Sequence, residues 1–125
     1  MNVKETIKTY IYSQRKAAVQ LLQQLVQQPS VRGNEGKTQA IVVEKCRQLC
    51  LEIDLWDLDE DPKLKTHASF HCDREQFKGN PNMVAVLKGR GGGKSLILNG
   101  HIDVVPEGNE ADWHVSPFSG VEEND

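Results

Sequence analysis

The chain of 125 residues lacks several features that would assign it to a class at once. No uninterrupted apolar run approaches the roughly 18 residues that a membrane-spanning helix needs. Residues 1–5 do not have the continuous apolar core of a signal peptide. Only three cysteines occur, without the spacing of a disulfide framework. We therefore expect reduced thiols and a cytoplasmic location, and no membrane among the partners.

Positive charge is missing from the last part of the chain. Residues 95–125 carry seven acidic residues and no Lys or Arg, whereas residues 1–94 carry all 15 Lys and Arg with 11 acidic residues. A nucleic-acid binder needs a basic face, so we expect no nucleic acid among the partners. An acidic segment that contains histidine suits a metal cation better. A solvated acidic segment is the alternative interpretation of the same charges.

Hydrophobic periodicity predicts two helices in the first half. Apolar residues at spacings of three and four predict a long amphipathic helix over residues 3–28, which Pro29 ends. A second helix is predicted over residues 36–49. Cys46 and Cys50 lie on its apolar face, where we expect both thiols in the core.

The second half predicts strands. Alternating apolar and polar residues predict a strand at 51–56, and short apolar runs predict strands at 83–87 and 95–98. A glycine-rich connection at 88–94 joins the last two, and the polar residues 58–80 predict an exposed excursion. The predicted fold class is α/β, with two helices followed by a mixed sheet. At 14.0 kDa the chain is one domain or part of a larger one, with about two-thirds of its unfolded surface available for burial.

Two further segments resemble known ligand-binding motifs, but neither has the residues or the local structure that its motif requires. Residues 91–95 read Gly-Gly-Gly-Lys-Ser, but Lys88 stands where a phosphate-binding loop needs its first glycine, and a strand rather than a helix is predicted to follow. His67, His71 and Cys72 could share a metal on a helix, yet their segment has no helical stripe, which favours an exposed loop. A small metal-binding module that uses these three with His101 is the alternative.

The most informative segment follows the strand predicted at 95–98 and reads Asn-Gly-His-Ile-Asp-Val-Val-Pro over residues 99–106. Ligands bind at the carboxyl ends of strands in α/β sheets. Residues i and i+2 of an extended segment point to the same side, so Asp103 can accept a hydrogen bond from one ring nitrogen of His101. That bond fixes the tautomer and raises the basicity of the other nitrogen, as in metal-ligating histidines. An ordinary surface pair is the alternative.

This segment, together with Trp113 and Pro117-Phe118, resembles the first signature of the zinc-dependent aminoacylase and metallopeptidase family. Its members include acetylornithine deacetylase, succinyl-diaminopimelate desuccinylase, aminoacylase and glutamate carboxypeptidase. The resemblance covers essentially the whole chain and is greatest to acetylornithine deacetylase. Its upstream features are Pro29-Ser30-Val31, Gly33, Glu35 and Asn80-Pro81-Asn82.

The resemblance implies that residues 1–125 are an incomplete, N-terminal portion of a zinc-peptidase-like catalytic domain. The rest of that domain and a dimerisation domain would lie beyond residue 125. His101 would be a ligand of one of two zinc ions, for which Co²⁺ can substitute, and Asp103 the catalytic acid that orients it. Trp113, Pro117 and Phe118 would pack the floor of the site, while Glu122-Glu123 lies too early to be the family's later Glu-Glu pair.

The implied function is removal of an acyl group from a small N-acyl amino acid or peptide. Because a catalytic zinc takes about three protein ligands, we expect these 125 residues alone to be inactive. We also expect them to expose apolar sheet surface or edge, and therefore to self-associate or to be marginally stable. The alternatives are a dipeptidase or desuccinylase of the same family, or a non-catalytic remnant that acts by self-association or binding.

Overall fold

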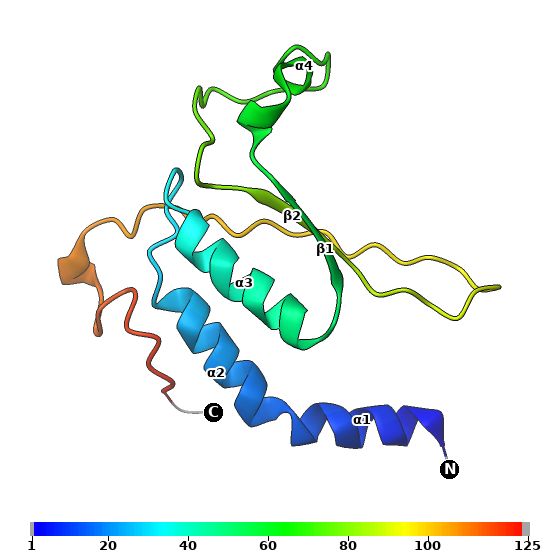
Figure 1. Cartoon of the computed structure of the whole chain (residues 1–125). Helices are drawn as coiled ribbons and strands as arrows, with labels where there is room; N and C mark the ends of the chain where they lie inside the picture. The colour runs from blue at the N-terminus through cyan, green and yellow to red at the C-terminus, as the bar shows by residue number, and fades with distance from the viewer. Residues whose placement is uncertain (1, 124–125) are drawn as a thin grey trace. The chain divides into compact units, whose positions relative to one another are not determined.

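The computed structural model describes residues 2–123 and divides the chain into two units. The first unit combines the two ends of the chain, residues 1–28 and 107–125, and the second comprises residues 29–106. Figure 1 shows the helices and strands of both. No helix within residues 2–123 has the length and apolar character needed to cross a membrane.

The first unit contains two helices where the sequence predicted one. Helix α1 spans Val3–Ser13 and helix α2 spans Arg15–Val26. The prediction of an unbroken helix over residues 3–28 is therefore wrong. The Ser13 hydroxyl donates to the Tyr10 carbonyl at 2.7 Å, and the amide of Gln14 is shared between the carbonyls of Tyr10 and Ile11. This competition for carbonyl groups tightens the last turn and ends α1.

The C-terminal segment of the first unit runs along α2. The amide groups of Gln23 and Gln27 donate to the carbonyls of Gly120 and Ser119, at 2.8 and 3.2 Å. Gly120 has a φ of +65°, and a Cβ there would lie 3.1 Å from the Gln23 carbonyl oxygen. Only glycine combines this backbone conformation with so close an approach to the helix. A short 3-10 helix, η2 (Glu110–Asp112), precedes this segment.

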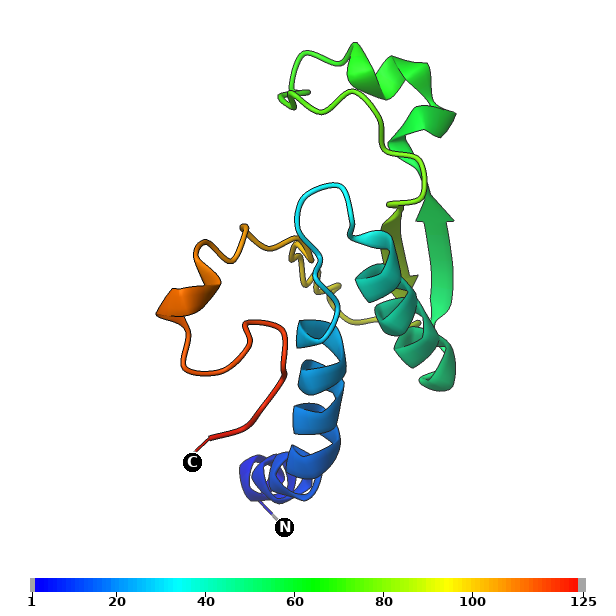
Figure 2. The same cartoon turned by 90° about the vertical axis from the view of Figure 1, so that its left-hand side faces the viewer.

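The second unit is built on a helix and a two-stranded sheet. Helix α3 spans Gly36–Gln48, and strands β1 (Glu52–Trp56) and β2 (Asn82–Val86) pair antiparallel, with Glu52 opposite Val86. Figures 1 and 2 show α3 lying along this pair, and it contacts both strands. The buried Val43 and Thr38 project from α3. The predictions of a helix at 36–49 and strands at 51–56 and 83–87 are confirmed within one or two residues.

The third predicted strand is absent from the described residues. Residues 95–98 are extended but unpaired, and Leu96, Ile97 and Leu98 are 82%, 85% and 88% exposed. The sheet is therefore antiparallel rather than mixed, and parallel pairing is limited to one isolated bridge between Val31 and Val104. An apolar run forms a strand only where neighbouring backbone groups are available to pair with it. The structure is compatible with an α/β fragment.

The core is small. Among apolar side chains of residues 2–123, only Val43 and Phe77 are buried. The accessible surface is 10683 Å², against about 6,700 Å² for a compact protein of 14.0 kDa. These residues therefore bury less of their surface than the two-thirds available to a self-contained unit of this mass.

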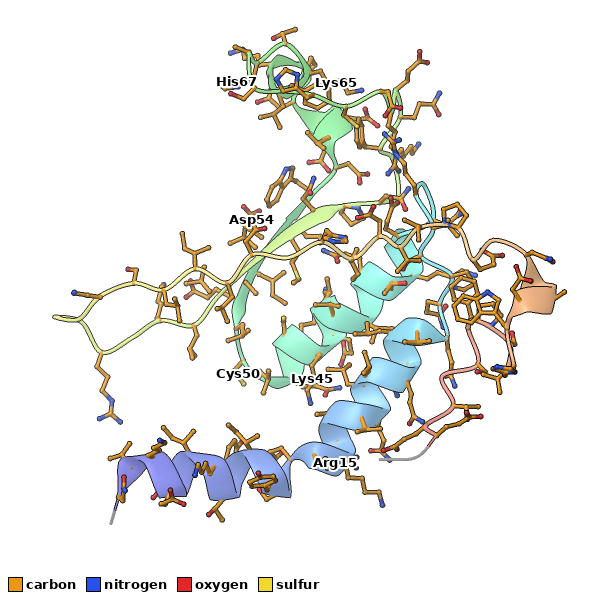
Figure 3. All side chains as sticks on the ribbon, turned by 180° about the vertical axis from the view of Figure 1, so that it is seen from behind. Arg15, Lys45, Cys50, Asp54, Lys65 and His67 are labelled. Carbon is orange, nitrogen blue, oxygen red and sulfur yellow. The ribbon has the colours of Figure 1, made fainter. Side chains whose placement is uncertain are left out.

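The expectation that the thiols of Cys46 and Cys50 both lie in the core is also wrong. Cys46 is half-buried, but Cys50 is exposed and has a φ of +56° (Figure 3). It stands just after the end of α3, where a left-handed residue closes a helix and lets the next amide, that of Leu51, reach back to the Cys46 carbonyl. Helical periodicity therefore stops short of Cys50.

Residues 57–80 form an excursion, as predicted, but one with its own small cluster. It contains a 3-10 helix, η1 (Leu58–Glu60), and a short helix, α4 (Pro62–Lys65). The ring of Phe77 is buried and meets the ring of Phe70 edge-on, with centroids 6.3 Å apart. The cations of Lys65 and Arg74 lie 5.3 and 5.0 Å from its centre. Phe77 thus gives this polar segment a local core.

Candidate functional site

The candidate site begins with His101 and Asp103, whose side chains lie on the same side of an extended segment. The His101 Nδ1 atom is 3.1 Å from Asp103 Oδ1 and 3.0 Å from the Asp103 carbonyl oxygen. Both neighbours only accept hydrogen bonds, so Nδ1 carries the proton, and in the neutral form of the ring Nε2 has the lone pair. The His101 side chain is 84% exposed. Its Nε2 atom is therefore available to an electrophile such as a metal ion.

Ser30, near the beginning of the second unit in the sequence, is hydrogen-bonded to the backbone on both sides of Asp103. Its hydroxyl donates to the Ile102 carbonyl at 2.9 Å, and its carbonyl accepts the Val104 amide at 3.0 Å. Val31, the next residue, forms the parallel bridge to Val104. The upstream Pro29-Ser30-Val31 thus lies beside the His101 segment. Sequence reasoning noted this tripeptide but missed its contact with the site.

The remaining upstream features gather around the loop that precedes α3. The Asn80 side chain donates to the Gly33 carbonyl at 3.1 Å and accepts the Gly36 amide at 2.9 Å. A Cβ at Gly36 would lie 2.1 Å from the Gly79 carbonyl oxygen, so only glycine fits there. Asn80 therefore joins the loop after Val31 to the start of β2.

Glu35 anchors the same loop to the excursion. Its carboxylate accepts the Gly33 amide at 2.9 Å and pairs with Arg74, one guanidinium nitrogen of which lies 2.9 and 3.2 Å from the two carboxylate oxygens. The two side chains are only 12% and 17% exposed. This half-buried ion pair fixes the loop whose first residues contact the His101 segment.

His67, His71 and Cys72 lie in an exposed part of the excursion, as the absence of a helical stripe predicted (Figure 3 labels His67). The Cys72 thiol contacts Arg32 at 3.6 Å, and His67 Nδ1 accepts the Ser69 amide. In the described part of the chain, no three His, Cys, Asp or Glu side chains gather in a group that could hold a metal. The structure thus does not gather these three residues and His101 into the metal module considered as an alternative.

Arg32 also pairs with Asp73 beside that cluster. The hydrogen bond from the Arg32 guanidinium lowers the pKa of the Asp73 carboxyl, and the same contact raises the pKa of Arg32. Both groups stay charged at neutral pH, and both are solvent-exposed. They form a surface ion pair rather than a reactive site.

The glycine-rich segment is not followed by a helix. Residues 95–100 continue as extended chain, so the helix N-terminus that a phosphate-binding loop requires is absent from the described residues.

Trp113, Pro117 and Phe118 belong to the first unit. Trp113 is exposed and its indole N–H donates to the Glu107 carbonyl at 2.9 Å, while Pro117 and Phe118 are half-buried. Their part in lining a site stays a prediction. Glu122 pairs with Arg15 at 3.1 Å within the same unit.

The chemistry of the donor set fits zinc in part. In His101 the Nδ1 atom is hydrogen-bonded to a carboxylate and the Nε2 atom faces away from it, the arrangement that orients zinc-ligating histidines. A catalytic zinc nevertheless takes about three protein ligands. Residues 2–123 bring one suitable ligand to this position, and a role for His101 in such a centre stays a prediction.

Comparison with known proteins gives partial relatives, and no protein-family model matches the chain. It is 28% identical over 126 residues to an N-formyl-4-amino-5-aminomethyl-2-methylpyrimidine deformylase of Halalkalibacterium halodurans, a match of 97% of this chain and 25% of that protein. It is 41% identical over 68 residues to a succinyl-diaminopimelate desuccinylase of Ruegeria pomeroyi, covering 54% of this chain and 18% of the relative. The Coxiella burnetii protein of the same name is 26% identical over 104 residues, covering 83% and 22%.

The chain spans a quarter or less of the length of these relatives. Their names describe removal of a formyl or a succinyl group, and desuccinylases are among the classes that the sequence resemblance indicated. The greater resemblance to acetylornithine deacetylase has no support among these three relatives. The findings suggest the aminoacylase and metallopeptidase family, and the chain is similar to its deacylating enzymes.

Proposed function

We propose that residues 1–125 are the N-terminal portion of the catalytic domain of a zinc-dependent hydrolase that removes an acyl group from an N-acyl amino acid. The main support is the geometry of the His101–Asp103 pair, in which the His101 Nδ1 atom donates to Asp103 and the Nε2 atom of the same ring is left to bind a metal. The similarity to enzymes named as a deformylase and desuccinylases supports the acyl-removing reaction.

His101 is proposed as a ligand of one of two zinc ions, with Co²⁺ as a substitute, and Asp103 as the residue that orients it. Bound zinc supplies an activated water and polarises the amide carbonyl of the substrate. The contribution of this chain is to hold the imidazole in one tautomer. Asp103 does so with both its carboxylate and its backbone carbonyl, which limits rotation of the ring.

The remaining ligands and the general base are proposed to lie outside these 125 residues. One histidine cannot hold a catalytic zinc, so the 125-residue chain by itself is proposed to have no hydrolase activity. The three cysteines are free thiols in the structure, which supports a reducing, cytoplasmic compartment.

The proposal also concerns which acyl group is removed. Resemblance favours N-acetylornithine as substrate, whereas the names of the relatives favour an N-succinyl amino acid. A single assay series decides between them. First, the source gene is sequenced past codon 125 and the full-length protein is expressed and purified with zinc. The rates at which it hydrolyses N-acetylornithine, N-succinyl-diaminopimelate and an N-formyl amine are then compared.

Two variants test the site in that protein. His101→Ala should abolish activity, and Asp103→Asn should reduce activity or zinc affinity by about 10- to 100-fold, as loss of a carboxylate behind a metal-bound histidine does. The matched controls are His67→Ala in the excursion and Asp54→Asn on the exposed face of β1 (Figure 3), which should change neither. Full activity in His101→Ala, or a gene that ends after codon 125, would overturn the proposal.

A further inference from the structure

We propose that Ser30 is a positioning residue for the His101–Asp103 pair, which rests on the function proposed above. Ser30 is 2% exposed and lies 72 positions before Ile102 in the sequence. It binds the two peptide groups on either side of Asp103, through Ile102 C=O at 2.9 Å and Val104 N–H at 3.0 Å.

These two hydrogen bonds bracket both backbone dihedral angles of Asp103. The first fixes the peptide group before its Cα atom, and the second fixes the peptide group after it. Because φ and ψ are the two soft dihedrals of a residue, holding both peptide groups holds the direction of the Cα–Cβ bond of Asp103. Ser30 thereby places the backbone from which the Asp103 carboxylate and carbonyl reach His101.

The second of these peptide groups also contacts the imidazole directly. Its N–H, from Val104, donates to the Ser30 carbonyl, while its C=O, from Asp103, accepts the His101 Nδ1 proton at 3.0 Å. A peptide group that donates and accepts at once is polarised, which strengthens both hydrogen bonds. The imidazole is thus connected to Ser30 through one peptide unit.

Among the hydrogen bonds of the described residues, those of Ser30 connect residues 101–104 to the rest of the second unit. The preceding residues 91–100 are exposed throughout and form no strand pairing in the structure. The hydrogen bonds of Ser30 and the adjoining Val31–Val104 bridge are therefore the observed attachment of residues 101–104 to the rest of the unit. Removal of the Ser30 hydroxyl leaves the Ile102 carbonyl without this partner.

The test uses the full-length protein and four variants. Ser30→Ala removes the hydroxyl alone, while Ser30→Thr and Ser30→Val are nearly equal in volume and differ in the hydroxyl. Ser13→Ala is the matched control, because its hydroxyl also donates to a backbone carbonyl, that of Tyr10, in the first unit. The readouts are the ¹⁵N signals of the His101 ring, hydrogen exchange at the Val104 amide, and kcat against KM.

Ser30→Ala keeps the backbone carbonyl that accepts the Val104 amide but removes the hydrogen bond to the Ile102 carbonyl. It is therefore expected to mix the two ring tautomers of His101 and, by loosening the backbone at Asp103, to speed exchange at Val104. It should lower kcat by about 10- to 100-fold, the range known for residues that support a metal-bound histidine, with little change in KM. Ser30→Thr should retain the native ring signals and Ser30→Val should lose them. Ser13→Ala should match the unmodified protein in all three readouts.

Unchanged ring signals and unchanged Val104 exchange in Ser30→Ala would overturn the positioning role. If Ser30→Ala does not fold, equal behaviour of the Thr and Val variants overturns the role and a difference between them supports it. If the ring and exchange respond to Ser30 but no substrate is hydrolysed, the proposed function fails while Ser30 still positions the pair. The two failures are therefore distinguishable.

Discussion

The ion pair between Glu35 and Arg74 is predicted to be the strongest polar contribution to the stability of the second unit. The perturbation is Glu35→Gln, which keeps the shape of the side chain and removes its charge. Arg74 would then stay half-buried, with its guanidinium over the Phe77 ring and its Nε donating to the Gln76 carbonyl at 2.6 Å. The variant therefore leaves an uncompensated charge in place.

The expected cost follows from burial. Removing one partner of a fully buried pair costs about 3–5 kcal/mol, and an exposed pair contributes about 0–1 kcal/mol. Side chains that are 12% and 17% exposed lie nearer the buried case, so we expect Glu35→Gln to lower the free energy of unfolding by about 2–3 kcal/mol. Arg74→Met should cost somewhat more, since it also loses the contact with Phe77, worth about 0.5–1 kcal/mol.

The assay is urea unfolding followed by the fluorescence of Trp56, at the end of β1. The chain has two tryptophans, so a Trp113→Phe background leaves Trp56 as the single reporter. A double-mutant cycle with Glu35→Gln and Arg74→Met should give a coupling of about 1.5–3 kcal/mol, as expected for residues in direct contact.

The control is the exposed pair of Glu44 and Arg47 on α3, whose atoms lie 3.8 Å apart with side chains 59% and 65% exposed. Its double-mutant cycle should give less than about 0.5 kcal/mol. A coupling near zero at Glu35 and Arg74, or a coupling equal to that of the control, would refute the argument from burial.

Two further predictions concern charge and exposed apolar surface. The hydrogen bonds from Lys65 and from the Phe77 amide lower the pKa of Asp59 in the folded chain. Since the folded pKa lies below the unfolded value of about 3.9, the contribution of Asp59 to the free energy of unfolding is fully present above that pH. It is lost as the pH falls through the folded pKa. Asp59→Asn should thus lower the urea midpoint at pH 7, with a deficit that shrinks below pH 4, and a deficit independent of pH would contradict this. Because Leu96, Ile97 and Leu98 are largely exposed, the 125-residue chain should self-associate in size-exclusion chromatography with light scattering, and Ile97→Lys should shift it toward monomer; a monomeric unmodified chain would count against the prediction.

The sequence alone predicted the elements whose signal is local. Helix α3 and strands β1 and β2 follow from periodicities of 3.6 and 2 that extend over only 5–13 residues. The contact between His101 and Asp103 is equally local, because positions i and i+2 of an extended segment share a side. At Gln14 and Cys50, where periodicity wrongly predicted a continuing helix, hydrogen bonds at the helix ends decided the outcome instead.

Other features depend on residues that are far apart in the chain. Ser30 meets Ile102 across 72 positions, Asn80 meets Gly36 across 44, and Arg74 meets Glu35 across 39. Hydrogen bonds of this kind leave no periodic pattern, so the sequence could mark these residues as parts of a resemblance but could not pair them. The strand predicted at 95–98 is the opposite case. Its apolar run is visible in the sequence, but the described residues bring no partner strand to it, so no strand forms.

By itself, then, the sequence determined the helical and strand segments, the histidine and its carboxylate, and the class of enzyme that the chain resembles. The tertiary structure decided which backbone groups hold that histidine segment and how Glu35 is anchored. The physical reason is that periodicity records which face of an element is apolar, whereas the position of a reactive side chain depends on hydrogen bonds between segments that only folding brings together.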